Sequence, residues 1–506
     1  MKKKQTIFSL FFLTAALFLL NACTDNKNED NGSNTINTES VRELKAELSS
    51  ESNQVNISWI NTDNPVLNKV EVTYRTKSIT GPKEVKILDA LGGNQQEIQI
   101  SLPDARHYLI TVTPLTNDGI RAMESIVETK LEGNEPIPTF LQRADTLMSS
   151  MYDHFMQDRD YKGIWRDKAD LTSGMAALWG QGSALSGYTT IRRASSKYPD
   201  YQLKYGDKLA DELFDNGIEK FRTQRDDVIE GLEAYACFPG QGNERFYDDD
   251  VWVALDMVDM YEQTHNEKYK ERAELIWRFL MSGYDLNQGG GIYWKEQDRN
   301  SKNVCSTAPT TVMAAKMYLL TGEEQYKDMA IKLFDWLVNT LQDPIDHLFY
   351  DNINIQGSIS KAKFSYNAGQ PMQAAVLLYQ ITNDEKYLKE AQRIASAAFK
   401  HWFKTYDSPW LNETIAYIDG HTWFNAILLR GFVELYLVDK NRTYINAYEQ
   451  MLSNLWLSEK GHDRYMELLN YNDFKGLTTQ TEWEILHTGA CVEMLAQLAI
   501  LESKGL

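Results

Sequence analysis

A spaced tyrosine and threonine motif, repeated along the second half of the chain, restricts the fold more than any other feature. The copies begin at Tyr261, Tyr318, Tyr379 and Tyr436, so that successive starts lie 57, 61 and 57 residues apart. In each copy an apolar pattern of helical period ends, a short polar turn follows, and a new helical pattern begins at a second tyrosine. Each repeat is therefore predicted to be a hairpin of two helices.

Six hairpins of this length fill residues 137–506. Closing them into a ring would bury every inner helix against two neighbours, and we therefore predict an all-α domain with an (α/α)6 barrel. An open helical solenoid that only binds partners remains the competing architecture. The amphipathic segments that we expect to be helices are 138–156, 172–196, 203–223, 249–265, 267–282, 306–321, 324–341, 366–381, 384–403, 421–437, 441–457 and 479–503.

Residues 41–131 have a different period. Apolar and polar residues alternate over 55–59, 70–74 and 108–112, which is typical of strands, and turn signals such as Asn117-Asp118-Gly119 separate the runs. About seven short strands fit here, which predicts a small all-β sandwich. The order of Trp59, Tyr108 and the last turn resembles an immunoglobulin-like fibronectin type III module. Such a module implies a spacer, with carbohydrate binding as the alternative.

The N-terminus reads as a targeting segment. Three lysines precede an apolar run over residues 7–20, and Leu20-Asn21-Ala22-Cys23 follows at once, which resembles a bacterial lipobox. The resemblance implies a signal peptide over 1–22, lipid on Cys23 and a polar tether over 23–40. We therefore expect an extracytoplasmic protein anchored to the outer membrane, at the cell surface or on the periplasmic face. A plain secretory signal is the alternative.

The amino-acid composition limits the classes of partner that the protein can bind. A formal net charge of -19 argues against nucleic acid, because phosphate backbones need a positive surface. Beyond Cys23, the remaining cysteines Cys237, Cys305 and Cys491 lack metal-ligand spacing, so we expect no disulfide framework, no metal and no cofactor, and each of the three as a small buried apolar residue. We expect the protein to be a monomer.

Three consecutive acids mark the candidate site. Asp248, Asp249 and Asp250 follow a glycine-containing loop and open a predicted helix. One aspartate suffices to cap a helix, whereas three adjacent carboxyl groups repel one another and raise at least one pKa. Retaining glycoside hydrolysis needs such a pair, one carboxylate as nucleophile and one as acid and then base. From these acids alone, capping and catalysis stay equally open.

At this point the sequence resembles glycoside hydrolase family 76, the endo-α-1,6-mannanases. The resemblance rests on Tyr247-Asp248-Asp249 with Trp252, and on the segments 289–295, 302–303 and 364–369. It implies a retaining, endo-acting cleavage of α-1,6-linked mannan, with Asp248 as nucleophile and Asp249 as general acid and base. A register shifted by one residue would select Asp249 and Asp250 instead.

The same segments suggest a sugar-binding wall around the acids. Glycines 289–291 are predicted to let the backbone approach a ligand and leave the following ring open. Trp179 is interpreted as core, and His421 and Trp423 as rim contacts or structural residues. The residues that we expect to bind substrate are Tyr247, Asp250, Trp252, Tyr293, Trp294, Asn303, Tyr366 and Asn367.

Two other functions stay open. The first is a catalytically silent surface lipoprotein that captures glycan, and the second is a barrel glycosidase that acts on another α-glycan. The intact acid pair favours the mannanase.

Overall fold

The computed structural model describes residues 39–49, 54–76, 84–102, 107–130, 139–158, 161–170, 172–198, 201–225, 229–240 and 242–503, and every structural statement below refers to these residues. The predicted signal peptide, Cys23 and nearly all of the tether lie outside them. The chain divides into two compact units, a β unit that ends near residue 129 and a helical unit that runs to the C-terminus. Each is described by itself.

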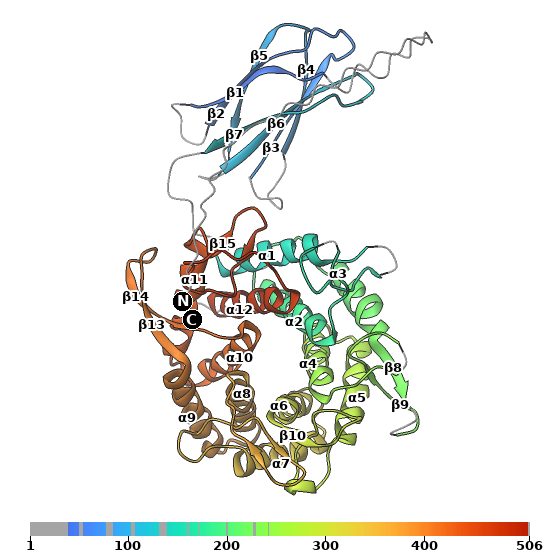
Figure 1. Ribbon diagram of the computed structural model, residues 1–506, viewed down its shortest axis with the longest axis vertical. Helices are drawn as coiled ribbons and strands as arrows, with labels where there is room; N and C mark the ends of the chain where they lie inside the picture. The colour runs from blue at the N-terminus through green and yellow to red at the C-terminus, as the bar shows by residue number, and fades with distance from the viewer. Residues whose placement is uncertain are drawn as a thin grey trace, which may run out of the picture. The chain divides into compact units, whose positions relative to one another are not determined.

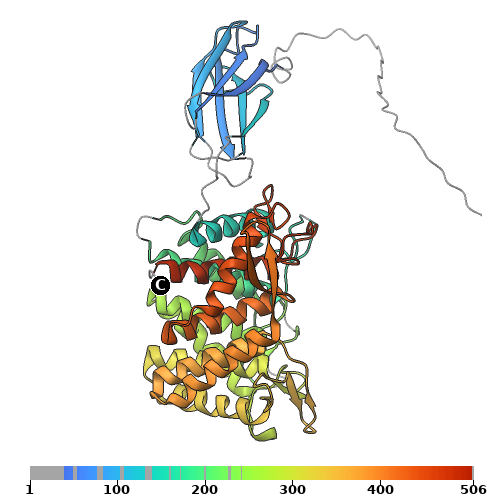
Figure 2. The same ribbon diagram turned by 90° about the vertical axis from the view of Figure 1, so that its left-hand side faces the viewer.

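The β unit contains the strands that the period-two pattern predicts, arranged in two sheets (Figures 1 and 2). Alternate residues of β2 are buried, among them Val55, Ile57 and Trp59, because successive side chains of a strand point to opposite faces. One sheet has the order β1 (Arg42–Leu48), β2 (Gln54–Ile60), β5 (Gln95–Ser101). The other has the order β4 (Glu84–Asp89), β3 (Lys69–Thr76), β6 (His107–Leu115), β7 (Ser125–Lys130).

The helical unit holds twelve α-helices in its described part, which confirms the all-α prediction for this region. Short hairpins and loops join them. The helices are α1 (Phe140–Phe155), α2 (Leu178–Ser195), α3 (Lys208–Ala210), α4 (Tyr247–Thr264), α5 (Glu267–Ser282), α6 (Val304–Thr321), α7 (Glu324–Thr340), α8 (Tyr366–Thr382), α9 (Glu385–Trp402), α10 (Thr422–Asp439), α11 (Thr443–Leu457) and α12 (Ile485–Ser503).

The even-numbered helices contact one another in a closed cycle. α2 packs on α4, α4 on α6, α6 on α8, α8 on α10, α10 on α12, and α12 returns to α2 (Figure 1). α5, α7, α9 and α11 each pack on the outside of a preceding or following inner helix. The inner helices are buried on most sides, whereas α9 buries one face, as expected of helices with uniform and one-sided hydrophobicity. Ile485–Glu502 of α12 has the length and composition of a membrane span, but it is mostly buried as one of these inner helices.

The repeated motif closes the inner helices. In the first copy the backbone N–H of His265, in the left-handed conformation at φ 52°, donates to the carbonyl of Tyr261 at 2.8 Å. The Thr264 hydroxyl donates to the carbonyl of Met260 at 2.6 Å, which holds the threonine side chain against the last turn of the helix. Tyr269, in the next helix, is buried. The same left-handed cap follows α6, α8 and α10, at Gly322, Asn383 and Lys440.

The short strands of the helical unit lie in the loops. They form four small sheets: β8 (Arg222–Arg225) with β9 (Leu232–Tyr235); β10 (Ser301–Asn303), β11 (Asn352–Asn354) and β12 (Ile359–Ser360); β13 (Phe403–Ser408) with β14 (Glu413–Ile418); and β15 (His462–Asp463) with β16 (Leu468–Leu469).

Three predicted helices differ in detail. The segment 203–223 is a three-residue α3, then a π-helix over Asp211–Gly217 and a 3-10 helix over Ile218–Phe221, so the prediction of one continuous helix is wrong there. The irregular backbone coincides with a close crossing, because a Cβ on Gly217 would lie 2.0 Å from the carbonyl oxygen of Gly163. α2 and α12 begin at 178 and 485, later than predicted, because irregular loops precede both helices.

Glycines allow a close helix crossing in the ring, between α8 and α10. A Cβ on Gly369 would lie 2.4 Å from the carbonyl oxygen of Ile427, and one on Gly431 would lie 2.5 Å from the carbonyl oxygen of Gly369. Because both obstacles are backbone, neither can turn aside.

Gly369→Ala is therefore expected to destabilise the helical unit by about 1–3 kcal/mol, the usual cost of overpacking. Thermal or denaturant unfolding followed by circular dichroism measures the change. Gly174→Ala is the matched control, since its Cβ would meet nothing within 4 Å. Equal stability of the two variants would contradict the close crossing.

Candidate active site

The three consecutive aspartates occupy the first turn of α4, and none of them caps the helix. The residue before the helix is Phe246, in extended conformation, and its side chain makes no capping hydrogen bond. The helix start is instead held by the neighbouring loop, where the N–H of Tyr247 donates to the carbonyl of Trp294 at 2.9 Å. Helix capping therefore does not account for the three acids.

A cavity of about 610 Å³ opens at the N-terminal ends of the inner helices, beside the acids. Its volume is in the range of small-molecule sites. Contributions come from the beginnings of α2, α4, α6, α8 and α10 and from the loops before them. The lining residues are Ala177, Trp179, Cys237, Phe246, Asp248, Asp249, Trp252, Trp294, Ser301, Asn303, Cys305, Asp351, Asn352, Phe364, Tyr366, Trp423 and Phe424.

Asp248 is partly exposed within this cavity. Its Oδ2 accepts a hydrogen bond from Trp294 Nε1 at 3.1 Å, whereas its Oδ1 is buried and without a hydrogen-bond partner among the described residues. Burial raises the pKa of Asp248 to about 6, although the Trp294 hydrogen bond lowers it. Asp248 is therefore mostly ionised at neutral pH.

Asp249 also lines the cavity, and its surroundings oppose ionisation of its carboxyl group. Burial raises the pKa of its carboxyl group well above the usual range, and the negative charges of Asp248 and Asp250 raise it further. The pair can therefore hold a proton at a pH where free aspartates have lost theirs, as an acid and a nucleophile that share one site require.

Asp250 is fully buried and does not line the cavity. Its Oδ1 accepts a hydrogen bond from the N–H of Tyr235 at 2.9 Å, which joins the start of α4 to β9. Burial raises the pKa of Asp250, while the Tyr235 N–H and the charge of Arg245 lower it. Arg245 is itself buried and paired with Glu296. Asp250 thus holds the loop in place beneath the other two acids.

Aromatic rings form much of the remaining wall. Trp294 is 43% exposed, so one face of its indole is open beside the acid that its N–H contacts. Trp252 meets Trp423 edge-to-face with ring centroids 4.9 Å apart, and Trp423 meets Trp179 in the same way at 5.3 Å. Tyr366 packs on Phe424 at 4.2 Å. Flat apolar faces beside a few polar groups suit the ring of a sugar.

Polar groups also contribute to the cavity wall. Asn303 lines the cavity at the start of α6, together with Cys305, and its contact with a sugar stays a prediction. Asp351 is a third carboxyl group in the lining; its oxygens accept from Asn352 Nδ2 at 2.7 Å and from Asn367 Nδ2 at 3.3 Å. Burial raises the pKa of Asp351. The described residues contain no group of three histidine, cysteine or acidic side chains that could hold a metal ion.

The structure brings Asp248, Asp249, Trp252, Trp294, Asn303 and Tyr366 together in the cavity lining and leaves four predicted substrate contacts outside it. Besides Asp250, Tyr247 is buried against Phe279 at 4.5 Å. Tyr293 is buried and donates to Asp285 Oδ2 at 3.0 Å. Asn367 reaches the cavity only through Asp351. A direct sugar contact by these four residues stays a prediction, and the structure gives each of them a role in support.

The glycines before Trp294 do not face the cavity. A Cβ on Gly290 or Gly291 would lie 3.1 or 2.6 Å from the ring of Trp336, on α7. All three glycines have positive φ, between 78° and 145°, which only glycine adopts at low cost. That these glycines admit a ligand stays a prediction; in this structure Gly290 and Gly291 allow the Trp336 ring to approach, and that packing holds the loop that carries Trp294.

Several lining residues were not predicted. Trp179 was interpreted as core, although it lines the cavity, and Trp423 was left between rim and structural roles. Cys237 and Cys305 also reach the lining, whereas Cys491 is a buried apolar residue as expected. Asp351 had no sequence signal beyond a single acid before a short strand. For Trp179, Cys305 and Trp423 the one available hint was position, since each lies in the first turn of an inner helix, whereas Cys237 and Asp351 lie in loops farther from one.

Comparison with known proteins assigns the family. The sequence profile of Glycosyl hydrolase family 76 matches residues 139–504. The chain belongs to this family.

Solved relatives include a family 76 mannosidase, Bt3792, from Bacteroides thetaiotaomicron VPI-5482. It is 41% identical, with a TM-score of 0.67 over 72% of this chain and 100% of its own. The family 76 α-1,6-mannanase of Salegentibacter sp. HEL1_6 is 23% identical, with a TM-score of 0.57 over 72% of this chain and 99% of its own, and therefore shows likeness of fold. That protein was solved as an inactive variant, with two adjacent aspartates replaced by asparagine, in complex with α-1,6-mannotriose.

Curated relatives are fungal. Mannan endo-1,6-α-mannosidase DFG5 of Candida albicans is 26% identical over 179 residues, which are 32% of this chain and 39% of that protein. The chain spans about half the length, or less, of the curated relatives that it matches.

The electrostatics of Asp249 predict a pH-dependent gain of stability on its removal. An unfolded aspartate has a pKa of about 3.9, and the pKa of Asp249 is higher in the folded protein. Below about pH 4 the carboxyl group is protonated in both states and does not change the free energy of unfolding. As the pH rises from there toward the folded pKa, the carboxyl group lowers the free energy of unfolding by an increasing amount. Asp249→Asn should therefore raise the melting temperature at pH 7 and have little effect at pH 4. A gain that is the same at both pH values, or a loss that grows with pH, would contradict the assigned pKa direction.

Proposed function

We propose that the protein hydrolyses α-1,6-mannosidic bonds within a mannan backbone, with retention of anomeric configuration. The observation that carries the proposal is a pair of neighbouring carboxyl groups, Asp248 and Asp249, that line one aromatic-walled cavity and both have a raised pKa. Membership of family 76 and the mannan-directed activities named for its relatives support the same substrate.

The family resemblance assigns the roles, and burial, which raises the pKa of both carboxyl groups, allows the pair to hold one proton between them. Asp249, as the general acid, donates a proton to the glycosidic oxygen as the bond to the anomeric carbon breaks. Asp248, ionised above a pKa of about 6, attacks the anomeric carbon and forms a glycosyl ester. Asp249, now a carboxylate, takes a proton from water; the water oxygen attacks the anomeric carbon, and Asp248 leaves as a carboxylate. Two displacements restore the original anomeric configuration.

The register shifted by one residue is disfavoured by geometry. A catalytic Asp250 would have to reach the substrate, yet its side chain is buried outside the cavity lining and engaged by Tyr235. The pair Asp248 and Asp249 meets that requirement, because both residues line the cavity.

The surrounding wall suits a neutral sugar chain. The open face of Trp294 provides a stacking surface beside Asp248. Asn303 and Asp351 offer hydrogen-bonding groups to hydroxyls. Because the described lining contains no lysine or arginine, it favours uncharged glycan over anionic substrates.

The proposal extends to the architecture and the location. The closed cycle of inner helices supports an (α/α)6 barrel, and the two sheets of three and four strands support a fibronectin type III-like sandwich. That unit is proposed as a spacer, since Trp59, Tyr74 and Tyr108, the only large aromatic residues in its described part, are buried and offer no platform for sugar. The lipobox supports an outer-membrane anchor on Cys23.

Single amide substitutions at the three acids test the function. Asp248→Asn and Asp249→Asn should each abolish the release of oligosaccharides from debranched α-1,6-mannan, because each removes one proton-transfer or nucleophilic group at nearly constant shape. Asp250→Asn should retain substantial activity, since an amide oxygen can still accept from Tyr235. Release is followed by chromatography of the products.

A binding measurement distinguishes an enzyme from a catalytically silent protein that only captures glycan. All three variants should still bind α-1,6-mannotriose in calorimetry, as expected if only the chemistry is lost. Wild-type protein that binds mannan and releases nothing would support the capture function instead. Loss of activity in Asp250→Asn, with activity kept in Asp248→Asn, would favour the shifted register.

A further inference from the structure

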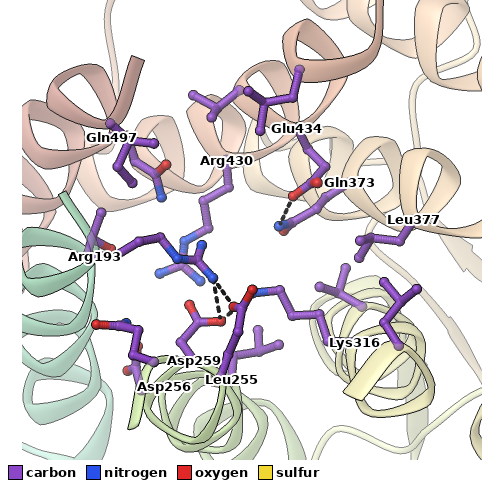
Figure 3. A pocket seen from close by; sticks show the side chains of 18 of the residues that line it. Arg193, Leu255, Asp256, Asp259, Lys316, Gln373, Leu377, Arg430, Glu434 and Gln497 are labelled. Atoms are coloured by element: carbon purple, nitrogen blue, oxygen red, sulfur yellow. Dashed lines mark hydrogen bonds and ion pairs between the residues drawn. The ribbon is translucent and has the colours of Figure 1, made fainter. Parts of the chain in front are cut away.

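A second cavity, of about 400 Å³, lies at the other end of the inner helices (Figure 3). Its lining comes from the C-terminal halves of α2, α4, α6, α8, α10 and α12. The charged groups here are largely paired: Asp259 with Lys316 and Arg193, and Arg430 with Glu493 behind the lining. Because these charged groups are already paired, they are not free to bind a ligand. The importance of this cavity lies instead in its contact with the lining of the catalytic cavity.

Arg430 connects the linings of the two cavities. It lines the second cavity, and Figure 3 shows its side chain reaching from α10 into the middle of that space. Its guanidinium carbon lies 5.7 Å from the ring centroid of Trp252, which lines the catalytic cavity. One contact, between a cation and an indole, thus forms part of the partition between the two ends of the ring.

The indole of Trp252 is held between two side chains of α10. Trp423 meets it edge-to-face at 4.9 Å, and Arg430 lies at 5.7 Å. Trp423 and Arg430 are seven residues apart, which is two helical turns or about 10.5 Å along the helix, enough to admit one ring between them. Because α4 and α10 occupy opposite positions in the cycle of inner helices, these contacts cross the centre of the ring.

The guanidinium group of Arg430 is held in place by an ion pair. Its Nε and Nη2 form a two-point ion pair with Glu493 of α12, the second hydrogen bond being 2.9 Å long. The side chains of Arg430 and Glu493 are 10% and 0% exposed, so little water competes with the pair. A desolvated cation beside an indole is among the stronger cases of this interaction.

We propose that Arg430 is a positioning residue for hydrolysis, which with Trp423 clamps the Trp252 ring at the bottom of the catalytic cavity. Trp252 follows Asp249 by three residues, so it lies on the same side of α4 as the acids. The ring therefore supports the sugar whose bond is broken. This inference rests on the proposed mannanase function and adds a residue that lies outside the catalytic cavity.

The test removes the positive charge of Arg430 together with the negative charge of its partner, Glu493. Arg430→Met combined with Glu493→Gln removes both charges, because a single buried charge left alone would destabilise the fold. The turnover number kcat on α-1,6-mannan should fall about 10-fold or more, since small misplacements of a bound substrate are costly, while KM changes less than about 3-fold. Arg430→Lys keeps a cation near the indole and should restore most of kcat.

A matched pair in the same cavity controls for general effects. Lys316→Met with Asp259→Asn removes another ion pair that does not contact Trp252, and kcat should stay within about 2-fold of wild type. Melting temperatures report on folding. If the methionine variant does not fold, Arg430→Gln with Glu493→Gln, whose amides can bond to each other, replaces it with the same expected loss of kcat.

Failure of the positioning role of Arg430 can be distinguished from failure of the proposed function. Equal loss of kcat in the test and control pairs, or unchanged kcat in a folded test pair, overturns the positioning role of Arg430 while wild-type hydrolysis leaves the proposed function intact. Wild-type protein that does not cleave mannan overturns both.

Discussion

The burial of three consecutive carboxyl groups in the first turn of α4 is the constraint on which the rest of the site depends. Burial and mutual repulsion oppose their ionisation, and the only general compensation from the helix itself is the positive end of its dipole. The surroundings add one specific partner to each end of the series: the Trp294 indole for Asp248 and the Tyr235 N–H for Asp250. Asp249 has no such partner in the described structure, so no hydrogen bond offsets the burial and the neighbouring negative charges that raise its pKa.

The loops around α4 are arranged to keep these partners in place. The glycines before Trp294 close on Trp336, and the buried pair of Arg245 and Glu296 joins the loop before α4 to the loop that carries the indole. Asp250 ties the helix start to β9. The ring of inner helices thus has two different ends, an aromatic and acidic one for substrate and one of paired charges. Trp252, between Trp423 and Arg430, lies where the two ends meet.

The sequence predicted the helices well because their periodicity and their repeated ends are local signals. The cap at His265 and the buried Tyr269 explain why one motif marks every hairpin from α4 onward. The acid pair was also predictable, since a run of aspartates at a helix start is unusual and matches a family signature. The structure places Asp248 and Asp249, but not Asp250, in the cavity lining.

What could not be predicted depends on contacts distant in sequence. Trp179 looks like core in its own helix, and only the position of α10 brings it to the cavity. Gly290 and Gly291 signal a close approach, but the sequence does not say that the neighbour is Trp336. Asp351 becomes a site residue only because β11 pairs with β10 beside α6. The break in the segment 203–223 likewise coincides with a backbone crossing at Gly163, which is distant in sequence.

The claim that Asp248 and Asp249 work as nucleophile and acid is tested most directly by the anomeric configuration of the first product. Proton NMR during the first minutes of mannan hydrolysis distinguishes the two anomers of the new reducing end before they interconvert. Two displacements at one carbon predict that the α-anomer appears first. The β-anomer appearing first would mean a single displacement by water and would contradict the account.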